Sequence, residues 1–264
     1  MTSGATSGTS RPEPLIVVQG LTAGYGNQIV LEDINFAVNR GEIFVILGGS
    51  GSGKSTLLKH MIGLQKPLRG RVLVEGADVF GDGDAETRSR LSRRFGVLFQ
   101  SGALFSSMTL AQNIALPLQE FTSLRKEMID LLVRMKLQMV DMEGVGEKLP
   151  SELSGGMRKR AALARAMALD PEILFFDEPS AGLDPVTSAD LDALILQLNA
   201  SLGTTMVVVT HELASILTIA QRVVMLDGST HRIIAEGNPK ELRDRHPDPR
   251  VRDFFQRKPS LRRA

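Results

Sequence analysis

The stretch GGSGSGKST, residues 48–56, constrains this chain more than any other part of its sequence. It matches the pattern GxxxxGK[ST], whose glycines let closely spaced backbone N–H groups surround phosphate oxygens. The run IFVIL precedes it and STLLKHMIGL follows it, which indicates a loop between a buried strand and a helix rather than a Gly/Ser linker. The sequence therefore predicts a phosphate site formed by Gly48, Gly49, Ser50, Gly51, Ser52, Gly53, Lys54, Ser55 and Thr56.

A second chemical signal lies at the end of ILFFDE, residues 173–178, where an apolar strand stops at two carboxylates. Such an ending is commonly a surface turn, but beside a phosphate loop it predicts hydrolysis of a nucleoside triphosphate. Lys54 would reach the β- and γ-phosphates, while Ser55 and Asp177 would hold Mg²⁺. Glu178 would orient and deprotonate the attacking water.

Three further residues are candidates for the same site. Gln100 follows the strand FGVLF and His211 follows TTMVVVT. Because ligands of open α/β sheets bind at the carboxyl ends of strands, we expect Lys54, Gln100, Glu178 and His211 to converge. A structural role is the alternative for His211. Tyr25, the only tyrosine, would either stack on a base or sit half-buried at a strand end.

The segment LSGGM, residues 153–157, begins a second helix that is suited to an anion. Ser154 is a capping residue, and Gly155 and Gly156 allow close approach to the backbone N–H groups. The chain already has a phosphate loop at Lys54, so this second helix start raises the question of which phosphate it contacts.

The order of apolar runs predicts an α/β fold with a mostly parallel sheet. Antiparallel strands are expected before the phosphate loop, and a helical insertion is expected over about 101–169. Within it, one helix would carry an apolar stripe on one face, formed by Leu124, Met128, Leu131, Leu132 and Met135. We divide the chain into a disordered lead-in (1–13), a main domain (14–240) and a basic tail (241–264).

Composition excludes several classes of protein. The formal net charge of +1 argues against bulk nucleic-acid binding. The absence of cysteine excludes disulfides and thiolate metal sites. No apolar run approaches the roughly 20 residues of a membrane span, and the first residues lack the pattern of a signal peptide. These features favour a cytosolic protein.

Six motifs in this order resemble an ABC-transporter ATPase subunit: GGSGSGKST, the FQ at 99–100, LSGGM, LFFDEP, SAGLDP and VTH. The resemblance implies a RecA-like P-loop ATPase core with an antiparallel β subdomain and an inserted helical subdomain. It implies ATP as cofactor, Tyr25 as the adenine-stacking residue, Gln100 as a further Mg²⁺ ligand and His211 as the switch histidine. It also implies a head-to-tail homodimer, in which Ser154, Gly155 and Gly156 contact the partner's ATP.

A closer resemblance is to the ATPase of Mla/Mce/TGD-type lipid transport systems. It rests on LFQSGALFSSMTLAQNIALPL, on Met157 where most ABC ATPases have Gln, and on HPDPRVRDFF. The resemblance implies an integral-membrane permease, an MCE-domain protein, a small STAS-type regulatory subunit and a place at the cytoplasmic face of the inner membrane. The sequence departs from this pattern twice: SAGLDP has the general ABC form, from which some Mla ATPases differ, and Gly49 stands where many ABC phosphate loops have Pro. Together these departures leave the cargo open between lipid and another small solute.

Two other kinds of ABC ATPase are less consistent with the sequence. DNA-repair members need a long coiled coil or zinc insertion, and only 99 residues separate Lys54 from Ser154. Translation factors carry two cassettes in one chain, whereas this chain has one.

Methionines of the helical stretch would either fill the core or line the groove for a permease helix.

The tail has nine Lys or Arg and four Asp or Glu between Asn238 and Ala264, a net charge of +5. Val251, Phe254 and Phe255 form a short apolar stripe on an expected helix. Docking onto the chain's own core and attraction to a membrane are alternatives for this stripe. We expect it to clasp a neighbouring ATPase or a regulatory subunit.

Overall fold

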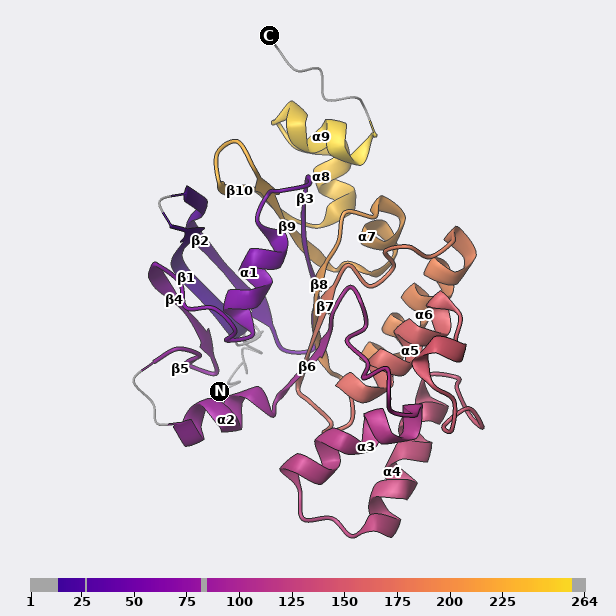
Figure 1. Ribbon diagram of the computed structural model, residues 1–264. Coiled ribbons are helices and arrows are strands. Elements are labelled where there is room, and N and C mark those ends of the chain that lie inside the picture. Colours follow the sequence, from indigo (N-terminus) through magenta and orange to yellow (C-terminus); the bar gives the residue numbers. More distant parts are fainter. Residues whose placement is uncertain (1–13, 27, 82–84, 258–264) are drawn as a thin grey trace, which may run out of the picture.

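The computed structural model describes residues 14–26, 28–81 and 85–257, so the predicted lead-in lies outside the described residues. Two sheets form the framework, with helices packed around the larger one (Figure 1). The predicted α/β fold, with an antiparallel sheet and a helical insertion, is confirmed.

The smaller sheet is antiparallel and contains the first strands of the chain. Its strand order is β2-β1-β4-β5. The bounds are β1 Pro14–Tyr25, β2 Gln28–Asn39, β4 Arg69–Val74 and β5 Ala77–Asp78. The long β1–β2 hairpin places Tyr25 at the turn, where it pairs with Gln28.

The larger sheet has six strands in the order β10-β9-β3-β8-β7-β6, all parallel except β10. The bounds are β3 Ile43–Gly48, β6 Phe95–Leu98, β7 Ile173–Asp177, β8 Thr205–Val209, β9 Arg222–Asp227 and β10 Arg232–Gly237. Every residue of β3 is buried, as its continuous apolar run predicts for a strand covered on both faces.

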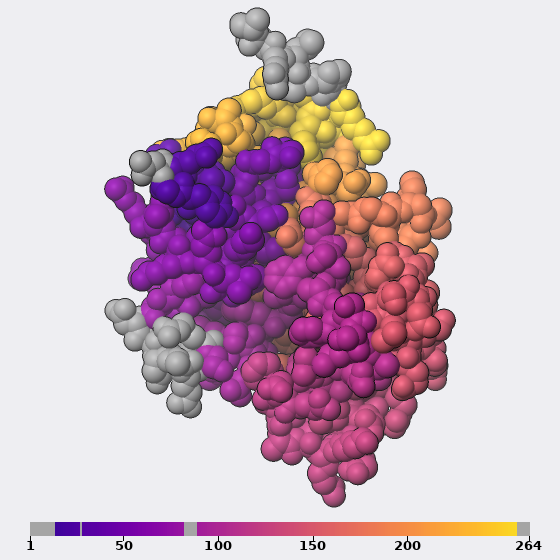
Figure 2. Space-filling model, in the orientation of Figure 1, coloured from indigo at the N-terminus to yellow at the C-terminus, as the bar shows by residue number. Residues whose placement is uncertain are grey.

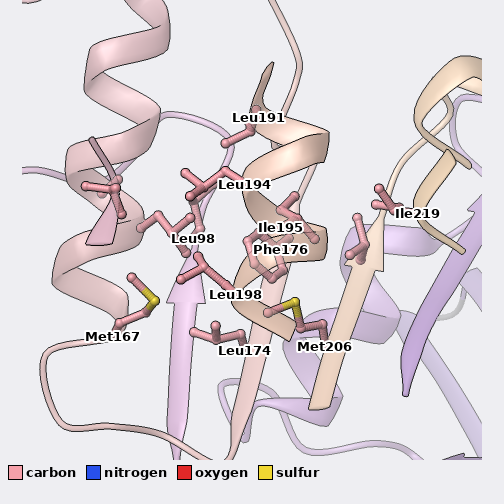
Figure 3. Close-up of a cluster of buried hydrophobic side chains, with 14 of the residues drawn as sticks. Leu98, Met167, Leu174, Phe176, Leu191, Leu194, Ile195, Leu198, Met206 and Ile219 are labelled. Carbon is pink, nitrogen blue, oxygen red and sulfur yellow. The ribbon is translucent and has the colours of Figure 1, made fainter. Parts of the chain in front are cut away.

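Alternate side chains of β3 enter two separate cores, one on each face of the sheet. Phe44 and Ile46 pack with helix α1 (Lys54–Met61) and the antiparallel sheet. Ile43, Val45 and Leu47 pack on the other side. That second core is covered by helices of the insertion together with α6 (Pro185–Leu202) and α7 (Leu213–Ile219). Figure 3 shows part of it, where Leu191, Leu194 and Leu198 of α6 face Leu98, Leu174 and Phe176.

The helical insertion projects from the edge of the larger sheet as a separate lobe (Figures 1 and 2). Its elements are α3 Leu110–Phe121, α4 Lys126–Met139, the 3₁₀ turn Pro150–Glu152 and α5 Gly155–Ala166. Helix α2, Ala85–Ser92, precedes β6 and lies outside the insertion. Among the described residues, no helix is both long enough and apolar enough to cross a membrane.

The predicted apolar stripe lies mostly on the exposed face of α4 and its N-terminal flank, not against the core. Leu124, Met128, Leu131 and Met135 are 41–48% exposed, and only Leu132 of the set packs against the core. The buried face of α4 consists of Ile129, Val133, Lys136 and Leu137. This second set has the same helical spacing, so periodicity alone does not tell which stripe meets the core.

The expectation that the apolar stripe of the tail contacts a neighbouring subunit is wrong. Helices α8 (Pro239–Arg245) and α9 (Pro249–Phe255) lie at the end of the molecule opposite to α3 and α4 (Figure 1). Val251 is 0% and Phe255 3% exposed, both within the chain's own core cluster, and Phe254 packs against it. The apolar stripe therefore docks on its own chain, and Arg250 adds an ion pair to Asp227 at 2.8 Å. Residues 258–264 lie outside the described residues.

Candidate functional site

The phosphate loop joins the carboxyl end of β3 to the amino end of α1. Gly53 caps α1 with φ of 95°, and no side chain caps the helix. Its first N–H groups therefore stay available to an anion, which the helix dipole also favours. Lys54 Nζ donates to the carbonyl oxygens of Gly48 and Gly49, at 3.0 and 3.1 Å. The lysine thus lies folded over the loop that would hold the phosphates.

Glycine is required at two positions of this loop by the close approach of neighbours. A Cβ on Gly53 would lie 2.7 Å from Leu31 Cδ2, and one on Gly48 would lie 2.6 Å from the carbonyl oxygen of Leu226. At Gly49 and Gly51, by contrast, a Cβ would meet nothing within 4 Å. The loop is therefore packed tightly at its two ends and open in its middle, as a cradle for phosphates needs to be.

The two strand-end carboxylates lie beside this loop in different surroundings. The Ser55 hydroxyl donates to Asp177 Oδ1 at 3.0 Å. Burial raises the pKa of Asp177, and the Ser55 hydrogen bond opposes that rise. Glu178 is 8% exposed and has a left-handed φ of 47°, a conformation that is rare and costly outside glycine. Its amide donates to the Val209 carbonyl of β8 at 2.8 Å, which helps to hold this conformation.

Three of the four residues expected to converge do so through the side chain of Glu178. Its Oε1 lies 2.8 Å from His211 Nδ1 and 4.0 Å from Lys54 Nζ. Its Oε2 is buried without a hydrogen-bond partner among the described residues. Burial lowers the pKa of Lys54, against the opposing charges of Glu178 and Asp177. His211 and Lys54 thus orient Oε1 of Glu178, while Oε2 remains free to accept a hydrogen bond or a proton.

Gln100 reaches the site through its backbone. The residue itself is exposed, and its carbonyl oxygen accepts a hydrogen bond from Lys159 Nζ at 2.6 Å. Lys159 also lies 3.4 Å from the carbonyl oxygen of Glu178. Sequence reasoning missed this lysine, although its spacing to Ala162 and Leu163 is that of a buried helix face.

Tyr25 lies at the end of β1 with 52% of its surface exposed. This half exposure agrees with the half-buried strand-end alternative and leaves the stacking role a prediction. Its hydroxyl is 3.4 Å from Gln65 Oε1, in the segment that follows α1. An exposed ring near this segment is free to stack on a planar group.

The second predicted anion site begins α5. Ser154 caps that helix by accepting a hydrogen bond from the Met157 amide at 3.3 Å, and Gly155 and Gly156 form its first turn. Ser154 is exposed. A Cβ on Gly156 would lie 2.4 Å from Thr187 Cγ2 of α6, the helix that Asp184 caps. The glycine therefore allows the first turn of α6 and the first turn of α5 to pack closely together.

Known proteins are similar to this chain along most of its sequence. The model of the ABC transporter family matches residues 31–181. The intermembrane phospholipid transport ATP-binding protein MlaF of Escherichia coli K12 is 42% identical over 91% of this chain and 88% of its own length. A probable ribonucleotide transport ATP-binding protein, mkl of Mycobacterium leprae, is 43% identical over 91% of this chain and 68% of its own length.

Solved structures of similar fold extend this agreement to three dimensions. CbiO1 of Clostridium perfringens, part of the transporter complex CbiONQ, has a TM-score of 0.80 at 29% identity and covers 92% of this chain and 96% of its own. The dimeric cassette MJ0796 in a post-hydrolysis state with ADP and Pi has a TM-score of 0.76 at 30% identity, covering 84% and 98%. The phosphate loop and the carboxylate at the end of β7 thus occur on a scaffold for ATP hydrolysis, and the chain belongs to the ABC transporter family as an ATP-binding, ATP-hydrolysing subunit.

Proposed function

We propose that this subunit drives lipid transport between membranes, as a homodimer bound to a separate integral-membrane permease at the cytoplasmic face of the inner membrane. The observation that carries the proposal is the 42% identity to MlaF over 91% of the chain and 88% of the relative. Under the same proposal, an MCE-domain protein and a small STAS-type subunit complete the system.

The hydrolytic step follows from the surroundings of Glu178. Its unpaired Oε2 would accept the proton of the attacking water, while His211 and Lys54 hold Oε1. Lys54 would leave the carbonyls of Gly48 and Gly49 for the β- and γ-phosphates, because those anions are stronger partners than neutral carbonyls. Tyr25 would stack on the adenine. Gln100 would contact the nucleotide site only while the γ-phosphate is present.

The residues present also fit Mg²⁺, which would supply charge neutralisation at the phosphates. Ser55 Oγ and Asp177 Oδ1, the two hard oxygen donors of the site, are already 3.0 Å apart. Among the described residues, no cluster of three or more His, Asp or Glu makes a metal cage. That is expected of a cation whose remaining ligands are phosphate and water. Gln100 would provide a further oxygen.

The dimer follows from the exposed start of α5. Head-to-tail packing would bring Ser154, Gly155 and Gly156 of one chain to the ATP held by the phosphate loop of the other. A helix N-terminus is by itself an incomplete anion site, and the second chain would complete it.

A permease helix would dock in a cavity of about 210 Å³ between β6, α3 and α5. β6 is the edge strand of the larger sheet, and Gln100 lies just beyond it. Arg93 lies 5.5 Å from the ring centroid of Phe121, and Arg165 lies 4.8 Å from that of Phe105. Arg93, Arg165 and the half-exposed Phe121 line the cavity, which therefore combines apolar surface with two guanidinium groups. The exposed stripe of α4, with Met128 and Met135, would serve a further protein subunit.

The partner class is tested by purifying the tagged chain from detergent-solubilised membranes and identifying what accompanies it. We expect a polytopic membrane protein with wild type and its loss with Phe121→Asp, whereas Val186→Asp, at another exposed apolar residue, should retain it. Recovery of ribosomes or DNA in place of a membrane protein would contradict the proposal.

The cargo is tested by reconstituting the resulting complex in vesicles. We expect ATP-dependent transfer of a fluorescent phospholipid that the Glu178→Gln complex does not perform. The mkl relative makes ribonucleotide transport the second candidate, to be measured in the same vesicles. Ribonucleotide transport without lipid transfer would decide for that candidate.

A further inference from the structure

Lys159 is a buried lysine that no catalytic role accounts for. It lies on α5, five residues beyond Ser154, and is 6% exposed. Lys54 and Lys136, also buried, each lie near a carboxylate, Glu178 and Asp170 respectively. Lys159 Nζ, within the described part of the chain, has no carboxylate oxygen within 4.0 Å and instead contacts the carbonyl oxygens of Gln100 and Glu178. Two neutral acceptors offset little of the cost of burying an ammonium group.

The two carbonyls that it contacts belong to the residues whose positions matter most for hydrolysis. Gln100 begins the loop after β6, and Glu178 begins the loop after β7. Glu178 has the left-handed φ of 47°, so its backbone needs restraint from several directions. Its amide is held by Val209, and its carbonyl is contacted by Ala181 and by Lys159. Lys159 is thus the side chain that connects both loops to α5.

Helix α5 carries this contact to the surface. Ser154, at its N-cap, is about 7.5 Å along the helix axis from Lys159, at 1.5 Å per residue. The intervening residues are continuous helix, so a displacement of the exposed end moves the buried amine with it. Burial lowers the pKa of Lys159, while the charges of Asp177 and Glu178 oppose that effect.

We propose that Lys159 is a positioning residue that ties the backbones of Gln100 and Glu178 to α5. The catalytic carboxylate of each chain then moves with the helix that contacts the other chain's ATP. This second statement rests on the head-to-tail dimer of the proposed function, whereas the positioning of Glu178 does not depend on it.

The first test compares Lys159→Met with Lys159→Arg and wild type. Methionine has a side chain of similar length but lacks the ammonium group that donates the hydrogen bonds. We expect kcat for ATP hydrolysis to fall about 10–100-fold in Lys159→Met, because small misplacements of catalytic groups have effects of this size. KM and the Kd for ATP should stay within about threefold, since the phosphate loop is untouched. Lys159→Arg should restore most of kcat. The control is Lys136→Met, another buried lysine of the helical lobe, with kcat within about twofold of wild type.

A double-mutant cycle separates positioning from a general structural role. In a Glu178→Gln background, adding Lys159→Met should lower the single-turnover rate less than about twofold, because the residue through which it acts is already gone. Equal losses in both backgrounds would overturn the proposal, as would an unchanged kcat in Lys159→Met. If Lys159→Met does not fold, Lys159→Gln replaces it. Failure of both to fold would show that the role is structural.

Mixed dimers locate the effect. When one chain carries Lys54→Ala and the other Ser154→Arg, the intact site uses Glu178 of the Ser154→Arg chain. Lys159→Met should reduce turnover most when it is placed on that chain. A larger loss from the opposite chain would overturn the positioning of Glu178. A mixed dimer that is inactive with Lys159 intact would instead count against the proposed dimer.

Discussion

Helices α1 and α5 both begin with glycine-rich turns, yet charged and polar side chains surround only the first of them. At α1 no side chain caps the helix, and Lys54, Ser55 and the β7 carboxylates surround it. At α5 the helix is capped by its own Ser154, which is exposed. The nearby cations point elsewhere, with Arg158 on the Leu153 carbonyl and Arg160 on Asp141.

The difference shows that a helix N-terminus becomes a catalytic phosphate site through the groups around it. The backbone N–H groups of α1 and α5 are chemically equivalent, and both carry the positive end of a helix dipole. Within residues 28–81 and 85–257, no hydrogen bond joins the phosphate loop to residues 154–157. Among these residues the α5 turn is therefore separate from the chain's own phosphate loop.

The largest effect should come from Glu178→Gln, which tests whether the α1 site is catalytically complete. Removal of a general base lowers turnover by about 10²–10⁴-fold, while ATP affinity should be kept because Lys54 and the loop are unchanged. Steady-state hydrolysis and nucleotide titration measure the two quantities, and gel filtration should show an ATP-trapped dimer. Near-normal turnover in Glu178→Gln would show that Glu178 is not the general base.

Mixing two inactive chains tests whether the α5 site acts on the partner's ATP. Lys54→Ala should weaken nucleotide binding, and Ser154→Arg should keep binding but block the composite site. Each homodimer should be inactive, whereas the mixed dimer has one intact composite site and should recover up to about half of wild-type turnover. Nucleotide occupancy is measured alongside, because strictly cooperative sites would stay inactive with one ATP bound. Equal impairment of binding at both sites would contradict the trans arrangement.

Alanine substitutions at the two N-cap residues compare what each helix start depends on. Gly53→Ala combines φ of 95° with a Cβ only 2.7 Å from Leu31, so we expect a loss of about 1–3 kcal/mol in the free energy of unfolding and weaker ATP binding. Ser154→Ala removes only a cap, worth about 0.5–2 kcal/mol, and should leave ATP affinity unchanged.

The control for this pair is Gly49→Ala, where a Cβ has open space. Chemical denaturation and nucleotide titration of the three variants give both quantities. Equal ATP affinity in Gly53→Ala and Gly49→Ala would show that the close packing at Gly53 is irrelevant to phosphate binding.

The smallest effect concerns the carboxylate beside α1. Because burial raises the pKa of Asp177 above 3.8, its protonated form favours folding below pH about 4. That contribution is lost as the pH rises through the raised pKa, so the ionised group lowers stability at pH 7. Asp177→Asn should then raise Tm at pH 7 by about 1–3 °C, since water still screens this partly buried group.

The gain in Tm should shrink toward pH 4, and the variant should gain less Tm than wild type from ATP with Mg²⁺. Thermal scans at several pH values, with and without ATP and Mg²⁺, provide the measurement. A lower Tm for Asp177→Asn at pH 7 would mean that the Ser55 hydrogen bond outweighs burial.

Local sequence patterns were sufficient for the strands, the phosphate loop and the order of the motifs. A buried parallel strand such as β3 needs an unbroken apolar run, and a phosphate cradle needs glycines at fixed spacing. Both requirements act over fewer than ten neighbouring residues, so a single sequence expresses them. The position of Gln100 and His211 after strands likewise predicted where they lie, because parallel strands end at one edge of the sheet.

Three features were decided only by the tertiary structure. Helix α4 has two apolar stripes of equal spacing, and contact with α3 and α5 determined that Ile129 and Val133 face inward while Met128 and Met135 do not. The stripe of α9 was covered by the chain's own core rather than by a partner. Lys159 reads as a surface lysine until residues 100 and 178, far away in sequence, are placed beside it. In each case the deciding contact joins segments that are distant in the sequence. The spacing of side chains along one helix does not determine which other segment packs against that helix.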